Sequence, residues 1–186
     1  MSSSEPPGSG KGAEAPGLSV VMPVRNALPH LDAAVQSILG QSFADFEFVI
    51  LDDASTDGSR ERLRELAAFD SRIRLIEVDE KLGPVASSNM VAQAAQAPFV
   101  GRMDADDISY PNRLGEQLRV LHDNPEAGVV ASLCDTIDSG GRILRQPEAW
   151  RLSRPSPFVP FAHGSMSNTE APCSTSRSFC APPPRS

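Results

Sequence analysis

The chain has 186 residues, a length typical of one domain with its own hydrophobic core, and 17 Lys and Arg against 24 Asp and Glu give a net charge of −7. An isoelectric point near 4.9 argues against a protein that binds nucleic acid by neutralising phosphates. We find neither a transmembrane segment nor a signal peptide, and the three cysteines fit no disulfide framework or zinc spacing, so we expect a cytoplasmic protein.

Composition divides the chain into three segments. Residues 1–17 are rich in Ser, Pro, Gly and Glu and are expected to form a disordered leader. Residues 18–154 have the pattern of an α/β domain. Residues 155–186 turn to Ser, Pro, Arg and Cys, which predicts an irregular or disordered tail. The abrupt loss of hydrophobic pattern after Met166 indicates an altered reading frame or an early stop, and hence a domain that is incomplete at its C-terminus.

The middle segment alternates apolar runs with stretches of helical periodicity. The runs typical of strands are residues 18–24, 46–51, 73–78, 98–103 and 128–134. The third run alternates and is expected near a sheet edge. Helices are predicted at residues 28–39, 59–69, 84–95 and 111–121, with Pro84 and Pro111 at the first helical positions. In the third helix, the buried face is predicted at Val85, Ser88, Ala92 and Ala95. This alternation predicts a Rossmann-like, mainly parallel sheet with helices on both faces.

Acidic residues follow two of the predicted strands. Asp52 and Asp53 end the second strand, and Asp104, Asp106 and Asp107 follow the fourth. One such cluster alone is as readily a turn or a helix cap. Two clusters at one edge of a parallel sheet would repel each other unless a cation lay among them. Carboxylate oxygens are hard ligands that suit Mg²⁺ or Mn²⁺ bridging to a phosphate.

Other known sites fail on spacing. An EF-hand loop starting at Asp53 would place Arg64 where the bidentate Glu belongs, and one starting at Asp104 would place Ser109 where Gly is required. The chain has neither a G-x-G-x-x-G after the first strand nor a G-x-x-x-x-G-K-[ST] sequence, which argues against a usual dinucleotide-binding fold and a P-loop enzyme. A receiver domain would be expected to carry its paired acids after the first strand, whereas here Asp52 and Asp53 follow the second, which argues against a receiver domain.

Several motifs together resemble the first half of a family 2 glycosyltransferase. They occur in the family's order and spacing at residues 19–26, 38–42, 49–58, 82–83, 89 and 102–114, so that the resemblance covers roughly residues 18–145. It implies the A-type fold of nucleotide-diphospho-sugar transferases, a nucleotide-sugar donor, and Mn²⁺ or Mg²⁺. The acceptor, a glycan, a lipid or a protein, is not identified by any motif.

The resemblance also implies which residues bind the donor. Those expected at its nucleotide are Pro23, Val24, Arg25, Asn26, Asp52, Asp53 and Asp104. Asp53 is favoured over Asp52 for the base and ribose. Asp106 would ligate the metal, and Asp104 would support it or contact the ribose. Arg25 stands where the family often has an aromatic residue, although a guanidinium can also stack on a base.

The catalytic residue is not identified by the sequence. In the family, the general base is an acid in the second half of the domain, commonly in a Glu-Asp pair. After Asp138 the only carboxylate side chains are Glu148 and Glu170, and they form no such pair. We therefore expect a glycosyltransferase of the hexosyltransferase type whose transfer activity is impaired. The alternatives are a non-catalytic nucleotide-binding module or fragment, and an acid-rich α/β domain without sugar chemistry.

Overall fold

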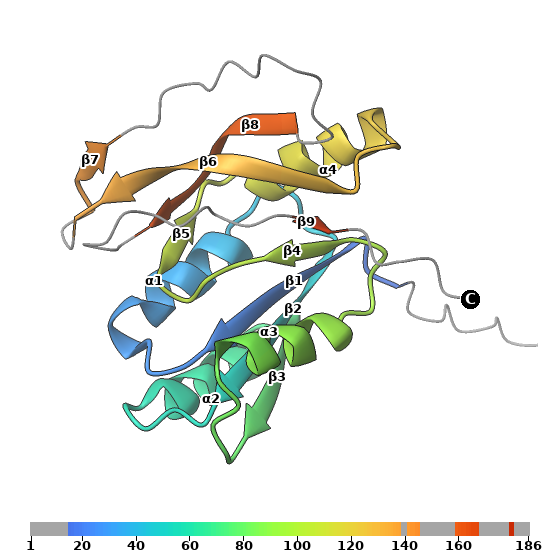
Figure 1. Cartoon of the computed structure of the whole chain (residues 1–186). Coiled ribbons are helices and arrows are strands. Elements are labelled where there is room, and N and C mark those ends of the chain that lie inside the picture. Colours follow the sequence, from blue (N-terminus) through green and yellow to red (C-terminus); the bar gives the residue numbers. More distant parts are fainter. Residues whose placement is uncertain (1–14, 139–140, 146–158, 168–178, 181–186) are drawn as a thin grey trace, which may run out of the picture.

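The computed structural model describes residues 15–138, 141–145, 159–167 and 179–180 (Figure 1). The strands in these ranges are β1 (Leu18–Val24), β2 (Phe46–Asp53), β3 (Ile73–Val78), β4 (Val100–Arg102), β5 (Asp107–Ser109), β6 (Val129–Ile137), β7 (Ile143–Arg145), β8 (Val159–Ser167) and β9 (Phe179–Cys180). The helices are α1 (Leu28–Leu39), α2 (Ser59–Phe69), α3 (Pro84–Gln93) and α4 (Arg113–Asp123). No helix in these ranges has the length and apolar composition needed to cross a membrane.

The strands form one sheet whose N-terminal part is parallel. The order is β3-β2-β1-β4-β9-β6-β8-β5, with β7 paired to β6 outside this path. β1 lies between β2 and β4 and is parallel to both, and β3 continues the parallel part at the sheet edge. The predicted Rossmann-like architecture and the edge position of residues 73–78 are therefore confirmed.

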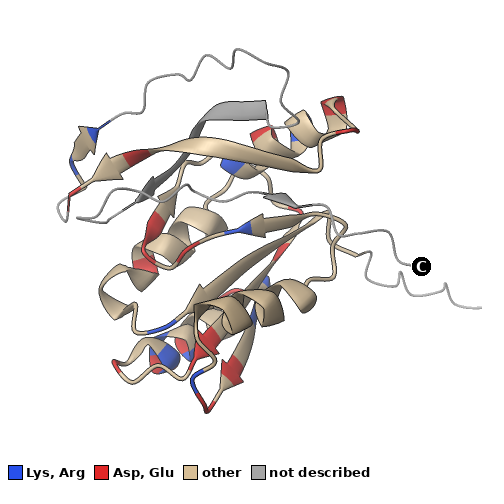
Figure 2. Cartoon of the chain, viewed as in Figure 1, with Lys and Arg blue, Asp and Glu red and all other residues tan. Residues whose placement is uncertain are grey.

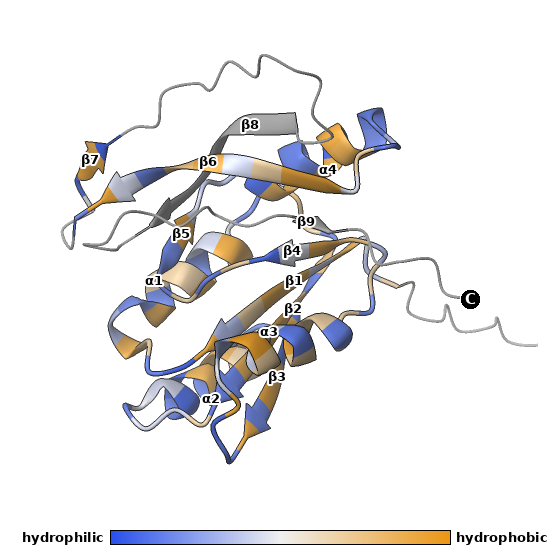
Figure 3. Ribbon diagram, viewed as in Figure 1, coloured by the Kyte–Doolittle hydropathy of each residue, from blue (hydrophilic) through white to orange (hydrophobic). Residues whose placement is uncertain are grey.

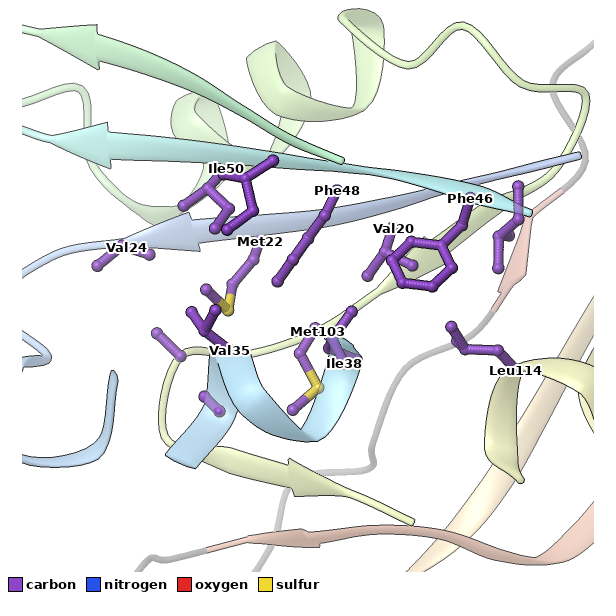
Figure 4. Packing of buried hydrophobic residues seen from close by; sticks show 14 of the residues in the cluster. Val20, Met22, Val24, Val35, Ile38, Phe46, Phe48, Ile50, Met103 and Leu114 are labelled. Carbon is purple, nitrogen blue, oxygen red and sulfur yellow. The ribbon is translucent and has the colours of Figure 1, made fainter. Parts of the chain in front are cut away.

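Alternation along the strands sends apolar side chains to both faces of the sheet, because successive residues of a strand point in opposite directions. On one face, Val20, Met22, Phe48 and Ile50 belong to the main core, where they meet residues of α1, α2 and α4 (Figure 4). On the other face, Val21, Val49 and Leu51 form a smaller cluster with Val91 of α3. The central strands are correspondingly hydrophobic in Figure 3, as expected for strands buried on both faces. Helices thus cover both faces, as predicted.

The helix α3 presents a different face to the sheet from the one predicted. Its buried residues are Ser87 and Val91, whereas Val85 is 73% exposed. The prediction failed because the Ala and Ser residues of this helix occur on several of its sides, so its apolar periodicity is weak. The packing of Val91 against β1 and β2 decides the rotation of the helix. In α4, the predicted start at Pro111 is two residues early, and the carbonyl of Pro111 instead accepts a hydrogen bond from the Ser42 amide at 2.9 Å.

Four short or late strands were not predicted. β5 and β7 lie in segments that read as connections, and β8 and β9 lie within residues 155–186, for which an irregular tail was expected. β8 pairs with β6 in parallel and with β5 in the antiparallel sense, and β9 bridges β4 and β6. Residues 1–14 of the expected leader (residues 1–17) lie outside the described residues, as do residues 146–158 and most of the segment after residue 167.

Candidate functional site

The carboxyl ends of the parallel strands meet at one edge of the sheet, and a pocket of about 380 Å³ lies there. Its lining residues are Pro23, Val24, Arg25, Asn26, Ala27, His30, Asp53, Pro84, Ser87, Ser88, Arg102, Asp104, Ala105 and Asp106. They come from the ends of β1, β2 and β4 and from the first turns of α1 and α3. Ligands of open α/β sheets bind beyond the carboxyl ends of the strands, and this pocket has that position.

The segment after β1 forms one wall of the pocket and is tied to the segment after β2. Asn26 has a φ of 49°, and its side-chain oxygen accepts a hydrogen bond from the Thr56 amide at 2.8 Å. Arg25 donates from Nη1 to the carbonyl oxygens of Asp53 at 2.5 Å and Ala54 at 3.0 Å. Residues 23–26, grouped by the sequence analysis, therefore all line the pocket, with the guanidinium of Arg25 bound to the main chain of β2.

Asp52 and Asp53 diverge because they are adjacent on one strand. Asp52 is fully buried on the α2 face of the sheet, where its Oδ2 accepts a hydrogen bond from Nε of Arg60 at 2.6 Å. Arg60 also donates to Asp79 and to the main-chain carbonyl of Val78. Asp53 points to the α3 face and lines the pocket. The structure thus brings Asp53 to the candidate site and leaves Asp52, the other predicted nucleotide contact, in an internal ion pair.

The carboxylate of Asp53 organises the opposite wall. Its Oδ1 accepts a hydrogen bond from the amide of Leu82 at 2.6 Å, and its Oδ2 accepts one from the amide of Gly83 at 3.0 Å. Gly83 has a φ of 87°, a left-handed value that favours glycine, and this turn presents two successive N–H groups to one carboxylate. Asp53 therefore fixes the start of α3, whose Pro84, Ser87 and Ser88 line the pocket.

The second acidic cluster lies across the pocket from α3, in the loop between β4 and β5. The Oδ1 of Asp104 accepts hydrogen bonds from Nε and Nη2 of Arg102 at 3.1 and 2.8 Å. Asp106 makes no hydrogen bond or ion pair with another residue of the described ranges, and it is partly exposed in the pocket. Its carboxylate is available to a ligand. Acidic residues are visible in this loop and around the end of β2, whereas α3 carries no charge (Figure 2).

Negative charge accumulates around this loop. Burial, with the neighbouring carboxylates of Asp104 and Asp106 acting in the same direction, raises the pKa of Asp107 to about 7. Asp107 lies in β5 and does not line the pocket, and the residue that caps α4 is Asn112.

The donor set of this loop fits a divalent cation that is shared with a bound ligand. In the described part of the chain, no group of three or more His, Cys, Asp or Glu side chains could hold a metal by itself. Asp104 and Asp106 supply hard carboxylate oxygens on the pocket wall, which suit Mg²⁺ or Mn²⁺. These ions usually keep few protein ligands and complete their coordination with water and substrate phosphates.

Several pocket residues were missed by the sequence analysis. They are Ala27, His30, Pro84, Ser87, Ser88 and Ala105. Ala27 and His30 begin α1 directly after the Pro23–Asn26 segment, so their proximity to the pocket could have been inferred from the chain order. The residues of α3 could not, because their rotation toward the pocket follows from the packing of Val91.

The chain is similar to known proteins in sequence and in fold. A family model described as glycosyl transferase family 2 matches residues 19–176. EpsE of Bacillus subtilis (strain 168), which is named as a glycosyltransferase, is 33% identical over 157 residues that cover 81% of this chain and 55% of EpsE. The chain spans about half the length of the curated relatives it matches first.

Two solved structures share the fold. TarS of S. aureus in complex with UDP-GlcNAc has a TM-score of 0.61 and 22% identity, covering 69% of this chain and 37% of TarS. The mannosyltransferase PcManGT of Pyrobaculum calidifontis, in complex with GDP-Man and Mn²⁺, has a TM-score of 0.59 and 25% identity. This match covers 65% of the present chain and 36% of PcManGT. Both similarities fall on the part of the chain that builds an α/β nucleotide-sugar transferase fold.

Proposed function

This chain belongs to glycosyl transferase family 2, and we propose that its pocket binds a nucleotide-diphospho-sugar together with a divalent cation. The observation that carries the proposal is the convergence of Asp53, Asp104 and Asp106 on one pocket from the ends of two strands that flank β1. Asp53 and residues 23–26 lie at one side of this pocket and the Asp104–Asp106 loop at the other. A ligand with a nucleoside at one end and a diphosphate at the other would match this division.

The nucleoside is assigned to the side formed by residues 23–26, Asp53 and the start of α3. Asp53 keeps acceptor capacity beyond its two bonds to Leu82 and Gly83, because each carboxylate oxygen has two lone pairs. A ribose hydroxyl or a base N–H is the donor that such a carboxylate would accept. Arg25 is held at the pocket wall by main-chain carbonyls, which gives its planar group a fixed place against a base.

The diphosphate is assigned to the loop that carries Asp104 and Asp106. Asp106 would ligate Mn²⁺ or Mg²⁺ directly, and Asp104 would support it from its position beside Arg102. The bound cation would supply Lewis-acid stabilisation of the departing nucleoside diphosphate. The structure of PcManGT contains GDP-Man and Mn²⁺, which supports a divalent cation in this family but does not select one for this chain.

The reaction proposed for the whole protein is transfer of the sugar to an acceptor hydroxyl. The described residues would bind the donor, orient its diphosphate and hold its negative charge beside the cation. A general base is needed to take the proton of the acceptor hydroxyl. No residue of this chain is assigned as the general base, because no Glu-Asp pair follows Asp138 in the sequence. We propose that the 186-residue chain transfers sugar poorly, because a missing general base reduces the rate by about 10²–10⁴-fold.

Isothermal titration calorimetry with UDP, GDP and dTDP, each with and without Mn²⁺, tests the proposed binding. The expected result is affinity for at least one nucleotide that rises when Mn²⁺ is present. Binding of none of them, or affinity that is the same with and without Mn²⁺, would contradict the proposal. The comparison of the three nucleotides also identifies the base, which the pocket residues do not.

Transfer is tested separately with nucleotide-sugars and Mn²⁺ by following the acceptor-dependent release of nucleoside diphosphate. A chain that binds nucleotides with Mn²⁺ but releases no nucleoside diphosphate from any nucleotide-sugar would be a non-catalytic binding module, which is the alternative function. Turnover at about 1 s⁻¹ or faster, as in ordinary enzymes, would refute the proposed impairment and show that a general base lies among the residues present.

A further inference from the structure

A buried arginine lies behind the loop that carries Asp104 and Asp106. Arg113 is the first residue of α4 and is 4% exposed. Its Nε donates to Oγ of Ser109 at 2.7 Å, and its Nη1 donates to the carbonyl oxygen of Arg102 at 3.3 Å. Arg102 ends β4 and Ser109 ends β5. One guanidinium therefore binds both ends of the acidic loop.

The contacts of Arg113 continue toward the pocket. Its Nη2 lies 3.8 Å from Sδ of Met103, the residue that precedes Asp104. Arg102, whose carbonyl accepts from Arg113, donates through its own side chain to Asp104. A chain of contacts thus leads from the buried guanidinium through Arg102 to a carboxylate in the pocket.

A second buried side chain supports the same end of the loop. Gln41, which follows α1, donates from Nε2 to Oγ of Ser109 at 3.1 Å and to the carbonyl oxygen of Tyr110 at 2.7 Å. Its Oε1 accepts a hydrogen bond from the amide of Leu114 at 3.0 Å. Ser109 is therefore held by both Gln41 and Arg113, and both are almost fully buried. Water does not compete for these bonds, so they define the position of the loop more strictly than surface contacts would.

The burial of a charge here calls for a reason other than stability. Burial lowers the pKa of Arg113 to about 10, with attraction to Asp107 acting in the opposite direction, so the guanidinium is charged at neutral pH. Well-packed apolar side chains in place of buried ionic groups often leave stability unchanged or increase it. They could not bind the two ends of the loop. The contacts of Arg113 therefore indicate that its charge is kept in order to hold the loop.

We propose that Arg113 is a positioning residue, which holds the 102–109 loop so that Asp104 and Asp106 can share one cation with the phosphates of the donor. This inference rests on the proposed function, because it assigns Arg113 to the same donor site. Arg113 should therefore affect the nucleotide affinity that is gained on adding the metal. It should not affect the affinity that depends on Asp53, because Asp53 lies on another strand.

The test compares Arg113→Met with the wild-type chain by calorimetry, using the nucleoside diphosphate that the wild type binds. We expect the affinity gained on adding Mn²⁺ to fall by about 10–100-fold, the range found when groups that orient metal ligands are removed. The affinity without metal should stay within about twofold, as for independent sites. Arg119→Met on the exposed face of the same helix is the matched control and should change neither affinity.

Chemical rescue distinguishes positioning from a general loss of structure. Added guanidinium ion at low, non-denaturing concentration should restore part of the Mn²⁺-dependent affinity to Arg113→Ala, because the side chain leaves a cavity of matching shape. It should restore none to Asp106→Asn. If the Arg113 variants do not fold, Ser109→Ala removes one end of the same contact with a small change and should lower the Mn²⁺-dependent affinity in the same direction.

The outcomes separate this inference from the proposed function. A wild-type chain without Mn²⁺-dependent nucleotide affinity would contradict the proposed function itself. A wild-type chain that has this affinity, together with a folded Arg113→Met variant that keeps it in full, would overturn the role of Arg113 alone. Equal losses of affinity with and without Mn²⁺ in that variant would also overturn it, since they would indicate damage to the whole pocket.

Discussion

The two acidic clusters of this domain lie at the ends of strands that flank β1, yet the protein treats their carboxylates differently. At the end of β2, Asp52 is paired with Arg60, and both oxygens of Asp53 accept main-chain hydrogen bonds. In the loop after β4, Asp104 has a single arginine partner, and Asp106 has no hydrogen bond or ion pair with another described residue. In the first cluster, Oδ2 of Asp52 and both oxygens of Asp53 are bonded to the protein, and only Oδ1 of Asp52 lacks a partner among the described residues. The second cluster is left to a ligand.

This difference shows how similar sequence patterns acquire different tasks. A carboxylate that accepts main-chain hydrogen bonds with both oxygens, as Asp53 does, holds the pocket walls in place, and its remaining lone pairs can accept a bond from a neutral ligand. Carboxylates that lie close together without such bonds repel one another and favour a cation. Substitutions of single residues in and beside the two clusters test this division.

The largest effect is expected from Asp106→Asn. The substitution removes a charged oxygen ligand from a partly exposed position, so the fold should remain intact. The affinity gained on adding Mn²⁺ should fall by about 100-fold or more, equivalent to about 2.8 kcal/mol, as expected for a direct ligand compared with a supporting group. Calorimetry with the bound nucleoside diphosphate measures it. Asp123→Asn, which changes an exposed carboxylate on α4, is the control and should leave the affinity unchanged. Unchanged Mn²⁺-dependent affinity in Asp106→Asn would remove Asp106 from the site.

Asp53→Ala should lower the affinity for the nucleoside and the affinity for the nucleoside diphosphate by similar amounts. The loss is expected at about 1–3 kcal/mol, because a charged acceptor is removed and the amides of Leu82 and Gly83 lose their partner. The measurement compares the affinity for the nucleoside with that for its diphosphate, with and without Mn²⁺. If the nucleoside affinity is unchanged and only the diphosphate affinity falls, the assignment of the two clusters must be exchanged.

Asp52→Asn should give the reverse result, a loss of stability with unchanged affinity. The substitution keeps the volume of the buried side chain but weakens its bond to Arg60, so the free energy of unfolding should fall by about 1–2 kcal/mol. Urea denaturation measures this loss, and calorimetry on the same sample measures nucleotide binding. Together with Asp53→Ala it separates the roles of two adjacent residues. A clear loss of nucleotide affinity in Asp52→Asn would return this residue to the binding site.

Ala54→Gly is expected to have the smallest effect. Ala54 has a φ of 52°, a left-handed conformation that is unfavourable for a residue with a Cβ atom. Glycine relieves this strain but loses more chain entropy on folding, so stability should stay unchanged or rise by up to about 1 kcal/mol. Ala33→Gly on the exposed side of the helix α1 should instead lower it by about 1 kcal/mol. Losses of similar size in both variants would show that the turn after β2 carries no strain.

The parallel part of the fold and the place of the site could be predicted from the amino-acid sequence. The bounds predicted for β1, β3, α1 and α2 agree with the structure, because their apolar patterns are clear. The two strands bury apolar side chains in both cores, and the two helices bury theirs in the main core. Since the ends of parallel strands meet at one edge, the positions of Asp53, Asp104 and Asp106 in the sequence were sufficient to place them together.

Tertiary structure decided what periodicity does not encode. The separate fates of Asp52 and Asp53 depend on which face of β2 meets α2 and which meets α3, and the rotation of α3 depends on where Val91 packs. No signal in the sequence singled out Arg113, yet this residue binds both ends of a loop that starts eleven positions earlier in the chain. Such contacts join residues that are distant in sequence, and their geometry exists only once the sheet and its helices have packed.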